Sequence, residues 1–289
     1  MGTISNGTVS IILLGVSYSI VLPLLLCVIF KKRFKAHLKP FFLGMLAYAA
    51  FSFCLVNLIN GLLLMFVDTS GFSSGMIFIY SLCTQTIGAL LAQSGKYYTI
   101  RILKNDPNPN KYAMRGDALE LGTGFGGLEA IMTIGITMAS YFSYAALVMQ
   151  TGSVQEVLNS FSGEDQAGVQ EILNLLTTSS TMDFLAINLQ GLAMIIFQIA
   201  STLLVFRAVF GENDKAYFRL ALIFHIIMIV PGCILNAGII SSVWFETITM
   251  LVFSVAALVY AYDKIKEYEK RHVKDMLSKS KGKKTIHLK

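Results

Sequence analysis

The chain has 289 residues, of which 55% are hydrophobic and only 14% are charged, whereas a water-soluble domain of this size usually carries about 25% charged residues. The mean hydropathy of +0.65 and long apolar runs exclude a water-soluble enzyme and a disordered or collagen-like chain. The net charge of +6 does not indicate a nucleic-acid partner, because the basic residues follow the membrane topology described below. The composition predicts an all-α polytopic membrane protein embedded in the lipid bilayer.

Seven segments are long enough to cross a bilayer as helices, which takes about 20 residues each. The first is not a cleaved signal peptide of the usual form, because no Lys or Arg precedes it and a basic cluster follows it at 31–39. The predicted spans are 9–30, 40–67, 76–103, 117–150, 182–210, 217–240 and 243–262.

The distribution of Lys and Arg predicts the orientation of the bundle. Most of the 23 basic residues fall in the segments after the first, third, fifth and seventh spans, which places the N-terminus outside and the C-terminus in the cytoplasm. Residues 1–262 then form one membrane domain, and 263–289 form a basic cytoplasmic tail, solvated and attracted to anionic lipid.

The segment 151–181, predicted to lie outside, is acidic but contains an apolar periodicity. Val169, Ile172, Leu173 and Leu176 recur at helical spacing, which indicates an amphipathic helix on the outer surface. Such a helix is either a solvated connector with one apolar face or a lid over a cavity. The connector is the favoured interpretation.

Ionisable residues inside membrane spans are costly and are therefore candidates for function. Glu129 lies about 18 Å from the cytoplasmic end of the fourth span and His225 about 12 Å from that of the sixth, at 1.5 Å per residue. Gln93 and Gln198 lie at a depth similar to that of His225. For the amides, interhelical hydrogen bonds that hold the bundle together are the favoured interpretation, but a carboxyl group in a dry bundle must be protonated, paired or hydrated.

A glycine-rich run, GTGFGG at 122–127, precedes Glu129. It is not a phosphate-binding loop, because no strand or aqueous cleft accompanies it. In a membrane helix, Gly122 and Gly126 at Gly-x-x-x-Gly spacing indicate close approach of a neighbouring backbone. Four glycines also weaken a helix by about 1 kcal/mol each, so a bend or break is expected at this level.

Two segments resemble the paired signature of a known family. Residues 92–97 read AQSGKY and residues 122–130 read GTGFGGLEA, and together they resemble the motifs of the YhfC-like intramembrane metalloproteases, which are related to the CAAX-protease and PrsW group. The family pattern is approximately FEExGRY on one helix and GxGHGGxEA on the next. The resemblance extends to KPFFLG at 39–44 and to the histidine of the sixth span, and so covers most of the chain.

The resemblance implies a catalytic site of which little is kept here. In the family, tandem glutamates would activate water, and histidines would bind metal or polarise the scissile carbonyl. Ala92 and Gln93 replace the glutamates, Lys96 replaces the arginine and Phe125 replaces the glycine-motif histidine. Gln198 stands where a further histidine is common. The catalytic and metal-binding candidates that remain are Glu129 and His225, and the binding candidates are Gln93, Lys96, Gly126, Gly127 and Gln198.

Catalytic zinc typically has three protein ligands, and only two candidates remain, so zinc is expected only if the site is still active. The favoured hypothesis is a catalytically impaired member of the family that binds a hydrophobic or lipidated peptide, or a partner helix, in the former active-site cavity. The alternative is an active peptidase with an altered site. A further alternative is a small-solute transporter or receptor, although the chain lacks receptor motifs and an inverted repeat. The resemblance implies a multi-pass protein of the bacterial plasma membrane.

Overall fold

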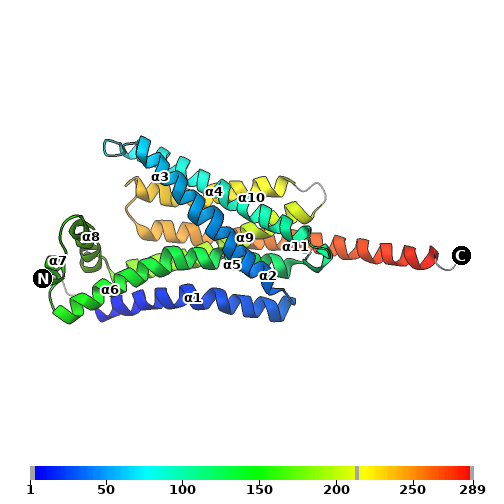
Figure 1. Ribbon diagram of the computed structural model, residues 1–289, viewed down its shortest axis with the longest axis horizontal. Helices are drawn as coiled ribbons and strands as arrows, with labels where there is room; N and C mark the ends of the chain where they lie inside the picture. The colour runs from blue at the N-terminus through cyan, green and yellow to red at the C-terminus, as the bar shows by residue number, and fades with distance from the viewer. Residues whose placement is uncertain (1–3, 113, 212–214, 287–289) are drawn as a thin grey trace.

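The computed structural model describes residues 4–112, 114–211 and 215–286, and all regular structure within them is helical. Seven helical stretches are long and apolar enough to cross a membrane, which confirms the predicted all-α membrane bundle. Figure 1 shows the stretches running along the long axis of the molecule, with the C-terminal tail leaving at one end. This end is called the tail end below, and the positive-inside rule predicts that it faces the cytoplasm.

The seven stretches begin and end within a few residues of most predicted boundaries. Two of them are compound, because a π-helical segment interrupts the α-helix. The stretches are α1 (Asn6–Phe34); α2 (Leu38–Ala47), η1 (Tyr48–Leu55) and α3 (Val56–Phe66); α4 (Ser74–Lys104); α5 (Arg115–Ala130), η3 (Ile131–Gly135) and α6 (Ile136–Thr151); α9 (Thr181–Phe210); α10 (Lys215–Asn236); and α11 (Val243–Ile286).

Helix α9 occupies the centre of the bundle. In its most apolar stretch 78% of the residues are buried, against at most 28% in each of the other six spans. A helix that is apolar on all sides is suited to such a position, since it has no face that must meet water. It packs against α1, α4, α5, α10 and α11, and thus contacts most of the helices that line the candidate site.

The glycine run does not break its helix, so of the two irregularities expected from the sequence, a bend or a break, the break does not occur at this level. Helix α5 is continuous through Gly122–Gly127, and the irregularity follows it as the π-segment η3. The weak helix propensity of glycine is overcome here by close packing on more than one side. An added Cβ on Gly122 would lie 2.7 Å from Cα of Ile199 on α9, and one on Gly124 would lie 2.8 Å from the carbonyl carbon of Phe41 on α2.

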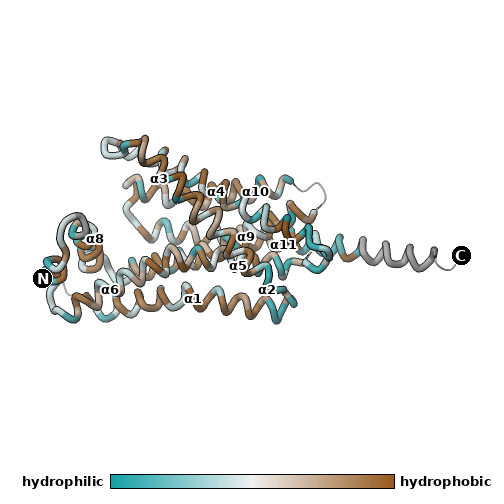
Figure 2. Tube along the Cα trace, viewed as in Figure 1, coloured by the Kyte–Doolittle hydropathy of each residue, from teal (hydrophilic) through white to brown (hydrophobic). Residues whose placement is uncertain are grey.

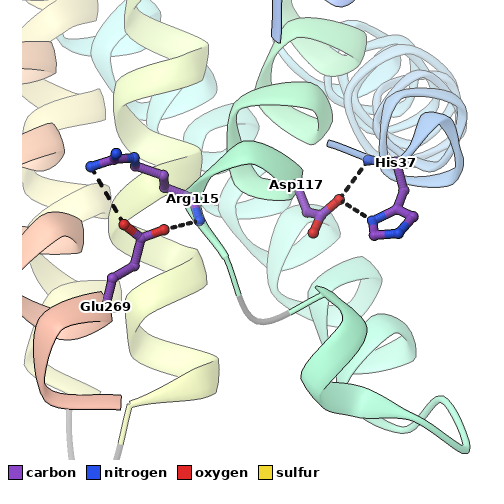
Figure 3. Close-up of polar contacts among 4 residues, drawn as sticks. All are labelled: His37, Arg115, Asp117 and Glu269. Atoms are coloured by element: carbon purple, nitrogen blue, oxygen red, sulfur yellow. Dashed lines mark hydrogen bonds and ion pairs between the residues drawn. The ribbon is translucent and has the colours of Figure 1, made fainter. Parts of the chain in front are cut away.

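Carboxylates from α5 itself and from α11 hold the start of α5 in place at the tail end (Figure 3). The residue before the helix, Met114, gives no side-chain cap. Instead, Oε1 of Glu269 on α11 accepts the backbone N–H of Arg115 at 2.6 Å, and its Oε2 lies 3.4 Å from Nη1 of the same arginine. Asp117 accepts hydrogen bonds from the backbone N–H and Nδ1 of His37, both at 2.9 Å. Negative charge at a helix N-terminus is stabilising, so these contacts fix the helix that carries Glu129.

The segment after α6 forms α7 (Val154–Asn159) and α8 (Glu164–Thr178) at the end of the bundle opposite the tail. The apolar face predicted from the sequence is directed inward, with Leu173 fully buried. It packs against Val148 and Tyr144 of α6 and against Ile4. Helix α8 therefore covers α6 and the N-terminal region, as expected of a connector with one apolar face rather than a lid over the cavity described below.

The predicted tail is a direct continuation of the last span. Helix α11 runs without a break from Val243 to Ile286, and Figure 2 shows hydrophilic residues beginning where it leaves the bundle. The structure differs from the expected solvated tail in its first turns, because Ile265 and Tyr268 are buried in the main apolar core. The sequence pattern did not predict this contact, because charged residues separate Ile265 from Tyr268.

Candidate functional site

A cavity of about 320 Å³ lies between two groups of helices and extends from mid-bundle toward the end opposite the tail. One wall comes from η1, α3 and α4, the other from α9, α10 and α11, and Glu129 of α5 lies at the mid-bundle level. Apolar walls carry a limited set of polar groups, as in many ligand sites. The polar side chains that line it are Tyr48, Ser52, Asn60, Thr84, Gln85, Glu129, Gln198, His225 and Glu246.

Lys96 forms the polar centre behind the inner wall of this cavity. Its side chain is fully buried, and Nζ donates to Oε1 of Gln198 and, at 2.6 Å, to Oγ of Ser201. The same ammonium group lies 4.5 Å from the centroid of the Phe125 ring. A buried cation is costly unless it is hydrogen-bonded and electrically compensated, and these contacts with α9 and α5 supply part of that compensation.

Glu129 is the acidic residue that interacts with Lys96. The carboxylate interacts electrostatically with the lysine and with the side chain of Gln198. Its Oε2 is buried and has no hydrogen-bond partner among the described residues. Glu129 also lines the cavity, so its carboxyl group lies between the cavity and the buried lysine.

His225 forms an interhelical hydrogen bond with Gln93. Nε2 of Gln93 on α4 lies 2.8 Å from Nδ1 of His225 on α10. With the amide as donor, Nδ1 accepts and the imidazole proton lies on Nε2. The ring also makes a T-shaped contact with Phe197 at 5.1 Å between centroids, so one nitrogen of the imidazole and part of its ring surface are already engaged by the protein.

These residues do not fit a catalytic zinc ion. Among the described residues, no group of three or more His, Cys, Asp or Glu side chains is placed to hold a metal ion. The two candidates predicted from the sequence are Glu129 and His225, and Nδ1 of the latter already accepts from Gln93. The buried ammonium of Lys96 adds positive charge where a divalent cation would have to bind, and this opposes metal binding.

Two positions at which the sequence resemblance implies a glutamate and a histidine now lie in one apolar cluster. Ala92 and Phe125 are both buried there with Ala47 and Tyr48. The Phe125 ring packs edge-on against Tyr48 at 5.5 Å between centroids. A hydrophobic contact between α2, η1, α4 and α5 therefore occupies the place expected for polar catalytic groups.

The structure brings some of the sequence candidates together and separates others. Glu129, Gln198 and His225 line the cavity, and Gln93 and Lys96 lie directly behind its wall through hydrogen bonds to His225 and Gln198. Gly126 and Gly127 instead pack against helices: an added Cβ on Gly126 would lie 2.8 Å from Cβ of Gln198, and one on Gly127 would lie 2.9 Å from Cγ of Pro23.

Sequence reasoning missed Glu246, a carboxylate in the cavity half farther from the tail. Glu246 lies in the first turn of α11. A search for charged residues deep within the spans does not select a residue so close to the end of its helix. Oε2 of Glu246 accepts from Nε2 of Gln190 at 2.9 Å. The signal that would have found it is an acidic residue in one span and an amide near the same end of a neighbouring span, because these can pair across helices.

Comparison with known proteins agrees with the sequence resemblance. The sequence pattern of the YhfC intramembrane metalloprotease family matches residues 18–252. A curated relative, the uncharacterized membrane protein YhfC of Bacillus subtilis (strain 168), is 25% identical over 256 residues, which cover 88% of this chain and 95% of the relative. No solved structure is detectably similar to this chain.

Proposed function

This chain belongs to the YhfC intramembrane metalloprotease family, and we propose that it binds a hydrophobic or lipidated peptide, or a partner helix, without hydrolysing it. The observation that carries the proposal is the apolar cluster that contains Ala92 and Phe125. The buried ammonium group of Lys96 lies over the Phe125 ring of this cluster. The positions implied for a base and a metal ligand are therefore occupied by packing side chains.

The polar groups that remain are poorly suited to peptide hydrolysis. Hydrolysis requires a base that takes a proton from water, and Gln93 cannot do this because a neutral amide is far too weak a base; its NH2 group donates a hydrogen bond to His225. An ammonium group such as that of Lys96 does not act as a Lewis acid toward a carbonyl oxygen, which is the usual role of the metal. Within the described parts of the chain, Glu129 is the carboxyl group that interacts with the buried lysine.

The cavity is nevertheless suited to binding a ligand from the bilayer. Oγ of Ser52 and Oε2 of Glu129 are buried without hydrogen-bond partners among the described residues, and both residues line the cavity. Helix α3 contributes Val56 and Asn60 to the wall but buries none of its own residues. A hydrophobic segment approaching through the membrane would therefore meet the cavity across one exposed helix.

The first test measures bound metal and peptide cleavage on the detergent-purified protein. The wild type and a variant with Glu129→Ala and His225→Ala are compared for zinc and cobalt content, and both are incubated with a labelled hydrophobic peptide library. We expect no stoichiometric metal in either protein and binding of peptides to the wild type without cleavage products. A family member that carries both glutamates and the glycine-motif histidine serves as the control for the assay.

The alternative of an active peptidase with an altered site predicts a different result. Stoichiometric zinc that is lost in the double variant, together with cleavage by the wild type, would overturn the proposal. Glu129 would then be the base and His225 a metal ligand. Absence of both peptide binding and cleavage under conditions where the control protein is active would also refute the proposed binding function.

A further inference from the structure

The half of the cavity farther from the tail contains a carboxylate, and the binding of apolar peptide side chains alone gives no reason for a charged group there. Glu246 projects from the first turn of α11 and lines the cavity beside Gly232 of α10. Oε2 accepts a hydrogen bond from Gln190. Oε1 of Glu246 lies beside α10, and a Cβ added to Gly232 would be only 2.8 Å from this oxygen. The glycine thus leaves room for one carboxylate oxygen at the cavity surface.

The charges around the cavity leave Glu246 without a cationic partner. The lining residues include two carboxylates, Glu129 and Glu246, and neither a lysine nor an arginine. Glu129 has Lys96 nearby, but none of the ion pairs found within the described parts of the chain includes Glu246. One neutral amide satisfies only part of the hydrogen-bonding capacity of a carboxylate.

Apolar side chains lie between the two carboxylates. From Gly232 to His225 the cavity wall follows α10 for seven residues, which is about 10 Å of helix. Met194, Phe197, Met228 and Met250 lie along this length. Methionine side chains adapt to varied apolar shapes, so this length of the cavity suits a short run of apolar side chains of differing shape.

We propose that Glu246 binds the primary ammonium group of a hydrophobic peptide, either its amino terminus or a lysine side chain, while the apolar residues of that peptide occupy the cavity toward Glu129. The inference rests on the proposed function and specifies the chemistry of its ligand. A charge-assisted hydrogen bond in a partly buried site contributes about 1.5–3 kcal/mol, which corresponds to a change of about tenfold or more in affinity.

The test uses the full-length protein in nanodiscs of phosphatidylglycerol and phosphatidylcholine, so that no lipid carries a primary amine. Three alanine-leucine peptides, labelled at the C-terminus, are compared: one with a free amino terminus, one N-acetylated, and one N-acetylated with a single lysine next to the acetyl group. We expect the peptides with an ammonium group to bind the wild type about tenfold more tightly than the peptide without one.

Substitutions then assign the effect to Glu246. The Glu246→Gln variant keeps an acceptor for Gln190 and should bind all three peptides with nearly equal affinity, whereas Glu171→Gln, which removes an exposed carboxylate from α8, should leave the discrimination unchanged. If the wild type binds all three peptides equally, or Glu246→Gln retains the preference, the inference is wrong and the proposed function stands. If no peptide binds, the proposed function fails as well.

Discussion

The buried ammonium of Lys96 makes a quantitative prediction about the stability of the bundle. In Lys96→Met a side chain of similar length fills the space, but the variant loses the donors to Oε1 of Gln198 and Oγ of Ser201. Each buried polar atom left without its partner costs about 1–3 kcal/mol, and removal of one member of a buried charge pair typically costs about 3–5 kcal/mol. We therefore expect the free energy of unfolding to fall by about 3 kcal/mol or more.

A double-mutant cycle separates the charge of Lys96 from its packing. Glu129→Gln removes the carboxylate that interacts with the lysine, and the variant with both substitutions carries neither charge. We expect the double variant to be more stable than the sum of the two single effects predicts, by about 1–2 kcal/mol. SDS-induced unfolding in mixed micelles, followed by helical circular dichroism, measures all four proteins.

A surface lysine serves as the matched control for this cycle. Lys39 is about half exposed and pairs with Asp106 at 3.1 Å, so Lys39→Met should change the unfolding free energy by less than about 1 kcal/mol. If Lys96→Met costs no more than Lys39→Met, the buried hydrogen bonds do not stabilise the fold. If the two effects in the cycle add to within about 0.5 kcal/mol, Lys96 is not the charge partner of Glu129.

Two further predictions concern how α5 is held, and the same unfolding measurement tests them. Gly124→Ala should destabilise the bundle by about 1–3 kcal/mol, because the added Cβ meets backbone atoms of Phe41; Gly61→Ala, with open space around it, should be neutral or slightly stabilising. Equal effects would mean that α2 and α5 are not in tight contact. Glu269→Gln should cost about 1–2 kcal/mol by weakening the cap on α5, whereas Glu267→Gln, at a side chain 41% exposed, should have little effect.

The hydrophobic pattern predicted the spans because hydrocarbon thickness fixes the length of a membrane helix. It could not predict the π-segments η1 and η3, which depend on packing between helices. The glycine run illustrates the difference: the sequence correctly indicated close backbone contact at Gly122, but the expected break did not occur there. The helix is continuous where Gly122 and Gly124 approach Ile199 and Phe41 closely, and single-sequence propensity contains no information about those neighbours.

The site was predictable only in the part where polar residues lie deep within spans. Depth along the helices brought Gln93, Gln198 and His225 to one level, and the structure has two interhelical hydrogen bonds there. Depth could not find Glu246, close to the end of its span. Nor could it find Glu120, a fully buried acid near the start of α5 whose two oxygens have no hydrogen-bond partner among the described residues. Its burial comes from neighbouring helices, which the sequence of α5 does not reveal.

The residues found at the positions where the sequence resemblance implies catalytic groups form a mutually consistent set. A histidine in place of Phe125 would need a hydrogen-bond partner inside the bundle, and with Ala92 beside it the apolar cluster offers none from that position. Phenylalanine instead packs against Tyr48 and presents the face of its ring to Lys96. Lys96 in turn donates a hydrogen bond to Gln198. A protonated histidine at position 198 would instead repel the ammonium group of Lys96. A polar group introduced alone at position 92 or 125 would therefore be buried in an apolar cluster.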